Sequence, residues 1–259
     1  MLTKSKIRKI NLLNSKKGRQ EVKMFVAEGF KVVQELISEG LVLEIFYTSK
    51  YLDFFSSHKE NFNEFSSSLI SESEFKKISS LINNNGVLAI CKQKDSIFDQ
   101  RKFLNSFSIY LDDISDPGNL GTILRVADWF NIENVFCSLN SVDCYNSKVI
   151  QSSMGSIARV NVNYLTFNQL LTFIRSSGDD SFKIFVSSLS KNSRSIYDLE
   201  TQKNGLLVVG NESHGVSEEI IKLADSLISI PRHFSSKTES LNAALATSIL
   251  LSEFFRRNR

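Results

Sequence analysis

The stretch DPGNLGTILR at residues 116–125 follows the apolar run FSIYL at 107–111, and the two together decide how the second part of the chain is expected to fold. The apolar run is typical of a buried strand, and the Pro-Gly pair is expected to turn the chain before Asn119 caps a helix over 120–130. Apolar residues recur in that helix at helical spacing, so they form a stripe that faces the core. Arg125 lies off the stripe and is expected to project from the helix.

The same alternation continues to the end of the chain. We expect strands over 135–137, 183–188, 206–209 and 227–230, and helices over 168–176, after Ser217 and over 240–256. Strands that alternate with helices favour an α/β fold with a mostly parallel sheet covered on both faces. Ligands of such sheets bind beyond the carboxyl ends of the strands. Two further motifs follow strands in this way: VVGNESHG at 208–215, and Ile230-Pro231 followed by SLN at 240–242.

The N-terminal part predicts a separate, small α/β domain over residues 1–95. We expect a helix over 19–38 with a break near Gly29, a strand over 41–48, a helix from the Ser71 capping box to Ile82, and a strand over 86–91. Residues 93–105 are polar and are expected to form a linker. The second domain is expected over 106–259.

Composition excludes several classes of protein. The chain has 259 residues, of which 42% are hydrophobic and 23% charged, and these values are typical of a soluble globular protein. It has no apolar run long enough to cross a bilayer, and no signal peptide is expected. Three cysteines without a CxxC pair and three histidines argue against a disulfide scaffold or a metal centre and favour the cytoplasm.

Residues 1–23 form a basic arm with eight basic residues and one acidic residue, a net charge of +7. Such an arm suggests a polyanionic partner, and a solvated charged helix is the alternative.

Each of the three motifs has a functional and a structural interpretation. Arg125, one turn into its helix, suits a phosphate clamp, or it pairs with Asp113, Asp116 or Asp128. Gly210 would let a ligand approach the backbone, and Glu212 would orient an Arg or Asn partner, or this motif is an ordinary strand-to-helix turn.

In the third motif, Ser240 is expected to cap the last helix and Asn242 to lie in its first turn, where its side chain needs a partner. We expect an inward face formed by Leu241, Ala244, Leu245 and Ile249.

Together, and in this order, the three motifs resemble the signature motifs of the SpoU (TrmH-like) branch of the SPOUT RNA methyltransferases, over about 107–259. Residues 25–35 and 86–89 are similar to the substrate-binding domain that precedes many of these catalytic domains. The resemblance implies a C-terminal trefoil knot, a homodimer and bound S-adenosylmethionine. The chain departs from the family pattern at Asn131, where related sequences often have Gly, at Gln151, where they often have a basic residue, and in the long segment 232–239.

The resemblance also implies a role for each site residue. Gly210, Ile230 and Leu241 would hold S-adenosylmethionine, and Arg125 would be the main catalytic residue. Asn119, Glu212, Ser240 and Asn242 would shape the site.

The expected reaction is methyl transfer to a ribose 2′-hydroxyl of RNA. Ribosomal RNA is the expected substrate because of the N-terminal domain, and transfer RNA is the alternative. In-line displacement at a sulfonium methyl needs no metal, and Arg125 would stabilise the charge that forms on the hydroxyl oxygen. A guanidinium stays protonated, so the proton acceptor is Glu212 or a water molecule.

Two other functions compete. A metal phosphoesterase would use Asp112, Asp113 and Asp116 together with the motif at 210–212, and a non-catalytic RNA-binding protein would bind no cofactor. A nucleotide-dependent oxidoreductase is disfavoured because the chain has no G-x-G-x-x-G motif and no P-loop.

Overall fold

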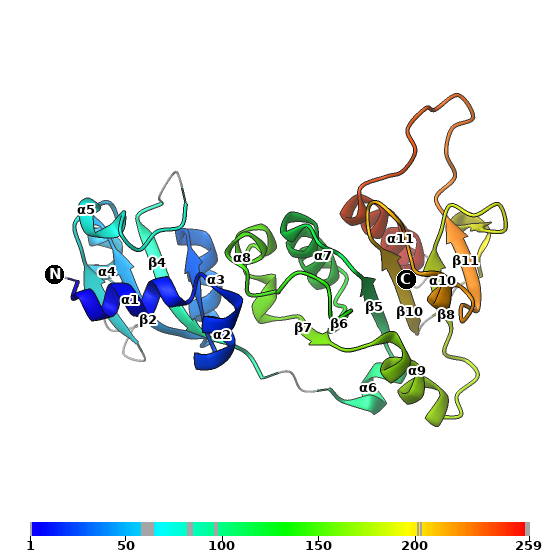
Figure 1. Ribbon diagram of the computed structural model, residues 1–259, viewed down its shortest axis with the longest axis horizontal. Helices are drawn as coiled ribbons and strands as arrows, with labels where there is room; N and C mark the ends of the chain where they lie inside the picture. The colour runs from blue at the N-terminus through cyan, green and yellow to red at the C-terminus, as the bar shows by residue number, and fades with distance from the viewer. Residues whose placement is uncertain are drawn as a thin grey trace. The chain divides into compact units, whose positions relative to one another are not determined.

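The structure is a computed structural model that describes residues 2–57, 65–81, 85–95, 98–200, 202 and 204–256. Two compact units divide the chain: residues 1–95 with 143–159, and residues 96–142 with 160–259 (Figure 1). The segment 143–159 therefore belongs to the first unit, although in sequence it lies between two strands of the second. The linear division at residues 95 and 106 stays a prediction.

The first unit is built on a four-stranded sheet of order β1-β4-β2-β3. Its strands β1, β4 and β2 pair antiparallel, and β3 pairs parallel with β2. The core contains Ile10, Leu13, Phe46, Phe75 and Leu88. The elements of this unit are α1 (Lys4–Leu12), α2 (Lys16–Val22), β1 (Met24–Glu28), α3 (Phe30–Ser38), β2 (Val42–Tyr47), η1 (Ser49–Tyr51), α4 (Leu52–Ser57), β3 (Ser66–Leu69), α5 (Glu72–Phe75), β4 (Val87–Lys92), α8 (Ser147–Ser153) and η3 (Ser156–Ala158).

The helix expected over 19–38 is wrong in its middle, where the chain forms β1 instead. Lys23 adopts the left-handed conformation and ends α2, and Gly29 with φ of 103° separates β1 from α3. Residues 25–28 are all buried, because β1 pairs with β4 and also contacts α3 and α8. A short apolar run buried on both faces has no period of two, so local pattern did not distinguish it from helix.

The capping box at Ser71 is confirmed, since its hydroxyl accepts from the Glu74 amide and the Glu74 carboxylate accepts from the Ser71 amide. The helix ends at Phe75, earlier than expected, and Ile82 lies outside the described residues.

The second unit contains a seven-stranded sheet of order β7-β6-β5-β10-β8-β11-β9, in which all the described pairs are parallel. The expected mostly parallel α/β sheet is confirmed. The expected strands and the four expected helices appear, with β7, β9 and α6 in addition. The helix α6 lies within residues 93–105, so the expectation that all of this stretch is a linker is wrong. The elements are α6 (Gln100–Leu104), β5 (Phe107–Asp112), α7 (Pro117–Trp129), β6 (Asn134–Cys137), β7 (Asn161–Tyr164), α9 (Phe167–Ser176), β8 (Ile184–Ser187), β9 (Arg194–Ser195), η4 (Ile196–Asp198), β10 (Gly205–Gly210), α10 (Glu218–Ile221), β11 (Ser226–Ser229) and α11 (Ala243–Arg256).

Aromatic and aliphatic side chains fill the core of this unit. Phe103, Tyr110, Phe136 and Phe167 belong to one cluster. Elsewhere Phe254 brings α11 against β5 and β8, and α11 packs on α7. The trefoil knot implied by the resemblance stays a prediction. None of the described helices is long and apolar enough to span a membrane.

Candidate active site

The first motif begins its helix earlier than expected. Asp116 is the N-cap of α7, and its Oδ1 accepts from the Asn119 amide at 2.7 Å. Pro117 occupies the first helical position, where its missing N–H costs nothing. The expectation that Asn119 caps the helix is therefore wrong, because Asn119 already lies in the first turn. Its side chain is buried and free to make other bonds.

A chain of side-chain hydrogen bonds joins all three motifs. Asn242 donates from Nδ2 to Asn119 Oδ1 at 2.8 Å, and Asn119 donates from Nδ2 to Oε1 of Glu212. Asn119 thus uses both ends of its amide, one toward each of the other motifs. The residues that meet in this way are separated in the sequence by 93 positions (Asn119 and Glu212) and by 123 positions (Asn119 and Asn242). The partner that Glu212 was expected to orient is Asn119, and the partner that Asn242 needs is the same residue.

Asn242, and not Ser240, caps the last helix. Its Oδ1 accepts from the amides of Ala244 and Leu245 at 3.0 and 3.2 Å. The expectation for Ser240 is wrong because α11 begins only at Ala243, and a capping side chain must directly precede the first helical residues. Ser240 is exposed three residues before the helix.

The buried face of α11 also differs from the expected one. Leu241 is 47% exposed and Leu245 59% exposed, whereas both were expected to face inward. Packing on α7 and the sheet instead buries a face formed by Ala243, Ala244, Thr247, Leu250, Leu251 and Phe254. Leu241 precedes the helix, so the helical period does not apply to it.

The second motif is a tight turn at the end of β10. Asn211 and Gly215 exchange two backbone hydrogen bonds of 3.1 and 2.9 Å. A Cβ on Gly210 would lie 2.2 Å from the carbonyl carbon of Gly215. Glycine is therefore required here by the turn itself, which holds Glu212 in place.

Each acidic residue near the site accepts a hydrogen bond from the protein itself. Asp112 accepts from the Ser217 amide at 2.9 Å, Asp113 accepts from the Ser138 hydroxyl at 2.5 Å, and Asp116 caps α7. Within the described part of the chain, no three His, Cys, Asp or Glu residues are placed to bind one metal ion.

Arg125 projects into solvent, as its spacing predicted. Across the described residues, its guanidinium has no hydrogen bond or ion pair, so the proposed pairing with nearby aspartates is not observed. Arg125 follows Asn119 by six residues, which places it about 9 Å along the axis and about 240° around it. It does not join the hydrogen-bond chain. Trp129, one turn further, is 84% exposed beside it.

Two of the residues expected to hold S-adenosylmethionine lie at the carboxyl ends of strands in the sheet. Gly210 ends β10 and Ile230 follows β11, and β8 lies between these two strands. Strand ends at this edge leave backbone groups available to a ligand. Leu241 and the half-buried Ile230 add apolar surface. In chemical character, this combination fits a ligand with an aromatic base and an aliphatic chain.

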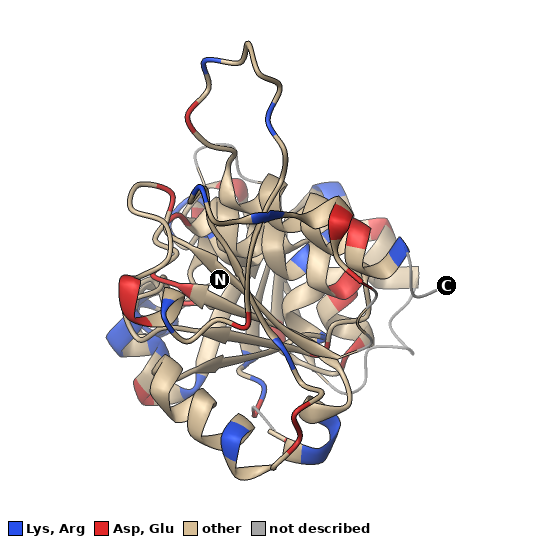
Figure 2. Ribbon diagram, turned by 90° about the vertical axis from the view of Figure 1, so that its right-hand side faces the viewer, with Lys and Arg blue, Asp and Glu red and all other residues tan. Residues whose placement is uncertain are grey.

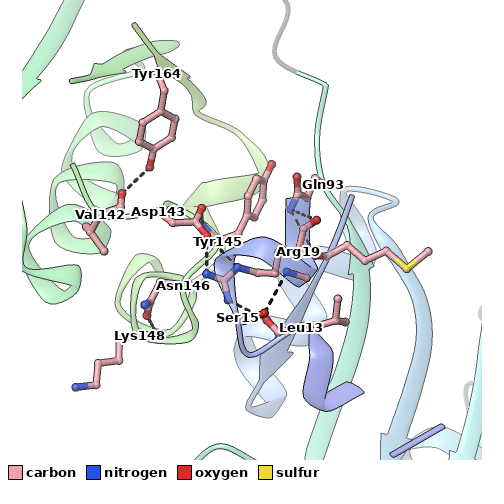
Figure 3. Close-up of polar contacts among 12 residues, drawn as sticks. Leu13, Ser15, Arg19, Gln93, Val142, Asp143, Tyr145, Asn146, Lys148 and Tyr164 are labelled. Atoms are coloured by element: carbon pink, nitrogen blue, oxygen red, sulfur yellow. Dashed lines mark hydrogen bonds and ion pairs between the residues drawn. The ribbon is translucent and has the colours of Figure 1, made fainter. Parts of the chain in front are cut away.

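The basic arm divides into a structural part and an exposed part. Arg19 is 4% exposed and donates from Nε and Nη2 to Asp143 at 2.9 and 2.5 Å and from Nη1 to the Leu13 carbonyl at 2.9 Å (Figure 3). Lys6 pairs with Glu44 at 2.6 Å. The remaining six cations are exposed: Lys4, Arg8, Lys9, Lys16, Lys17 and Lys23.

The sequence did not indicate that residues 143–159 contact the first unit. Asp143 pairs with Arg19, the Tyr145 hydroxyl accepts from the Lys94 amide at 3.0 Å, and Arg159 pairs with Glu35 at 2.8 Å. Burial raises the pKa of Tyr145, which keeps this hydroxyl neutral. No signal in the single sequence marks these residues as partners.

Comparisons with known proteins agree with this geometry. The model of the SpoU rRNA Methylase family matches residues 106–252, and that of the MRM3-like substrate binding domain matches residues 4–89. The 23S rRNA (guanosine(2553)-2'-O)-methyltransferase RlmP of Bacillus subtilis is 26% identical over 248 residues, 95% of this chain and 94% of that protein.

Solved structures are similar along nearly the whole chain. A putative RNA methyltransferase of the TrmH family from Porphyromonas gingivalis has a TM-score of 0.82 and 30% identity, and the match covers 99% of both chains. The AdoMet-bound rRNA methyltransferase from Sinorhizobium meliloti has a TM-score of 0.83 and 25% identity, covering 99% of this chain and 96% of that one.

Proposed function

The chain belongs to the SpoU rRNA methylase family, and we propose that it transfers a methyl group from S-adenosylmethionine to the 2′-hydroxyl of a ribose in ribosomal RNA. The substrate class is supported by the relative from Bacillus subtilis, which is named for 23S rRNA, and by the match to a substrate-binding domain.

One observation carries the proposal: the hydrogen-bond chain from Asn242 through Asn119 to Glu212. It joins three motifs that are far apart in sequence at the carboxyl edge of a parallel sheet, where ligands of such folds bind. Asn119 is buried, and both ends of its amide are used. A side-chain network of this kind fixes the orientation of Glu212 before any ligand arrives, and such preorganisation favours catalysis.

Each site residue then has a distinct part. Arg125 stabilises negative charge on the ribose oxygen and holds the neighbouring phosphate. Glu212 is oriented by Asn119 through Oε1, and its Oε2 accepts the proton of the hydroxyl. Asn119 and Asn242 position Glu212, and Ser240 lies exposed at the start of the SLN stretch of the third motif.

Gly210, Ile230 and Leu241 would hold S-adenosylmethionine through backbone and apolar contacts. When bound, this cofactor supplies an electrophilic methyl group. The residues of the chain orient the hydroxyl, exclude competing water and accept the proton.

A homodimer, RNA as the partner and the cytoplasm as the location complete the proposal. The exposed Trp129 on α7 and Leu245 on the adjoining α11 support the dimer, because they leave apolar surface in water. Sedimentation of the purified protein measures its oligomeric state. All three cysteines are free and buried, in keeping with a reducing compartment.

The test compares Arg125→Ala with Arg175→Ala, which removes another exposed arginine of the same unit. We expect Arg125→Ala to keep its melting temperature and its affinity for S-adenosylmethionine but to lose methyl transfer to unmodified ribosomal RNA. The loss should be on the order of 10²–10³-fold, as for other groups that stabilise a forming oxyanion. Transfer by Arg125→Ala at the rate of Arg175→Ala would refute the assignment. Ribose-methylation mapping of the product identifies the nucleotide.

A further inference from the structure

The segment of residues 232–239 projects from the second unit between β11 and α11 (Figures 1 and 2). It carries Phe234, which at 94% exposure is the most exposed large hydrophobic residue in the described part of the chain. A ring left in water adds little to folding. A single exposed apolar residue is common on protein surfaces, so its surroundings decide whether it has a function.

Contacts within the segment organise this ring. The centroid of the His233 imidazole lies 4.4 Å from that of the Phe234 ring, with 31° between the two planes. Nδ1 of His233 is 2.7 Å from the Ser235 hydroxyl, and Arg232 donates from Nη1 to the Thr238 carbonyl at 2.8 Å. The segment therefore presents two adjacent aromatic rings on a backbone that is held by its own hydrogen bonds.

The charge around the rings is basic. Arg232 and Lys237 are both exposed, and Glu239 is the one acidic residue in the segment. Aromatic rings next to exposed cations are the combination that binds single-stranded nucleic acid, because bases stack on the rings and phosphates pair with the cations. Lys237 favours RNA over a protein partner, because lysine is depleted at protein–protein interfaces.

The ends of the segment connect it to the active site. It begins directly after Ile230 and Pro231, and it leads into Leu241 and Asn242. Asn242 is bonded to Asn119, so the C-terminal end of the segment is anchored to the hydrogen-bond chain. A base that stacks on Phe234 would thus be held by the same part of the chain that shapes the site.

From these observations we infer that Phe234, supported by His233, is a stacking platform for an unpaired base of the RNA substrate, and that Arg232 and Lys237 bind the flanking phosphates. This inference rests on the proposed function for the identity of the substrate as RNA. It adds a binding site outside the three motifs and predicts that the target nucleotide lies in a single-stranded region.

The experiment measures binding of a labelled single-stranded oligouridylate by fluorescence anisotropy at several salt concentrations. Phe234→Ala should bind about 5- to 150-fold more weakly, the range expected for one stacked base, without a change in salt dependence. Phe234→Trp should bind as the wild type does. Leu189→Ala, which removes a side chain that is 70% exposed in another loop, should also bind normally.

The double variant Arg232→Gln/Lys237→Gln tests the phosphate contacts. It should reduce the slope of log affinity against log salt by about 1.4, since each phosphate contact to a single strand contributes about 0.7. Binding of a duplex RNA of the same length should depend little on Phe234, because its bases are already stacked.

Three results would overturn the inference: Phe234→Ala binds the oligouridylate as tightly as the wild type, it weakens S-adenosylmethionine binding instead, or it changes the sedimentation of the protein. The second would place the ring over the cofactor and the third against a second copy of the chain. RNA binding is measured without methyl transfer, so the two proposals fail separately. If the wild type transfers no methyl group but needs Phe234 to bind, only the proposed function fails.

Discussion

Replacing Arg19 by methionine is expected to lower the free energy of unfolding by about 3–5 kcal/mol, the cost of removing one partner of a buried ion pair. Methionine keeps much of the apolar length of the side chain and removes the guanidinium. The side chains of Arg19 and Asp143 are only 5% and 15% exposed. The change therefore leaves a largely buried carboxylate without its cation.

The magnitude follows from the three hydrogen bonds of the guanidinium. Two go to Asp143 and one goes to the Leu13 carbonyl, and bonds to charged groups contribute about 1.5–3 kcal/mol each. The two bonds to Asp143 share one carboxylate oxygen, so their contributions overlap. The Tyr145 amide still donates to the other oxygen of Asp143 at 3.1 Å, which favours the lower end of the range.

Urea unfolding of the wild type, Arg19→Met, Asp143→Asn and the double variant measures this cost and the coupling between the two side chains. Lys16→Gln, which removes an exposed cation of the same helix, is the control and should change stability by less than about 0.5 kcal/mol. A loss below about 1 kcal/mol for Arg19→Met would refute the reasoning, since it is the size expected of an exposed pair. In RNA binding the order should reverse: Lys16→Gln lowers the salt slope and Arg19→Met does not.

Three further predictions follow from single contacts. Gly210→Ala should destabilise the protein by about 1–3 kcal/mol or more in urea unfolding, because its Cβ meets the backbone of the following turn at 2.2 Å, and a stable variant would contradict that packing. Asn242→Asp should keep the helix cap and the melting temperature but lose the hydrogen-bond donor to Asn119 and most methyl transfer. Asn242→Ala should in addition lose about 0.5–2 kcal/mol of stability, because it removes the cap. Equal activity of the aspartate variant and the wild type would show that the donor is dispensable. Hydrogen bonds from the Ser71 amide and then from the Leu2 amide lower the pKa of Glu74 from 4.5 to about 2, so its stabilising effect is complete above pH 4.5 and is lost as the pH falls toward 2; an NMR titration midpoint near 4.5 would contradict this.

Much of the second unit could be predicted from the sequence, because its strands and helices carry their own signals. The apolar runs at β5, β8 and β10 and the helical stripe of α7 are local patterns. The first unit was harder. β1 is buried on both faces by β4, α3 and α8, and its pattern alone does not separate a strand from a helix.

The candidate site was predicted in its residues more than in its contacts. Arg125 was expected to project and does, and Glu212 was expected to orient a polar partner and does. The caps were assigned to the wrong residues, because Asp116 and Asn242 each lie three positions or fewer from an equally good capping side chain. Only the true first residue of each helix distinguishes them.

The sequence by itself determined the alternation of strands and helices, the mostly parallel sheet and the placement of three motifs after its strands, because periodicity and turn residues act over a few neighbouring positions. The tertiary structure alone decided which side chains meet. Asn242 reaches Asn119 across 123 positions, and Arg19 reaches Asp143 across 124. Contacts at such separations arise from the packing of whole elements. For this reason Arg19 of the basic arm is buried in an ion pair, while Lys16 and Lys17 beside it remain exposed to solvent.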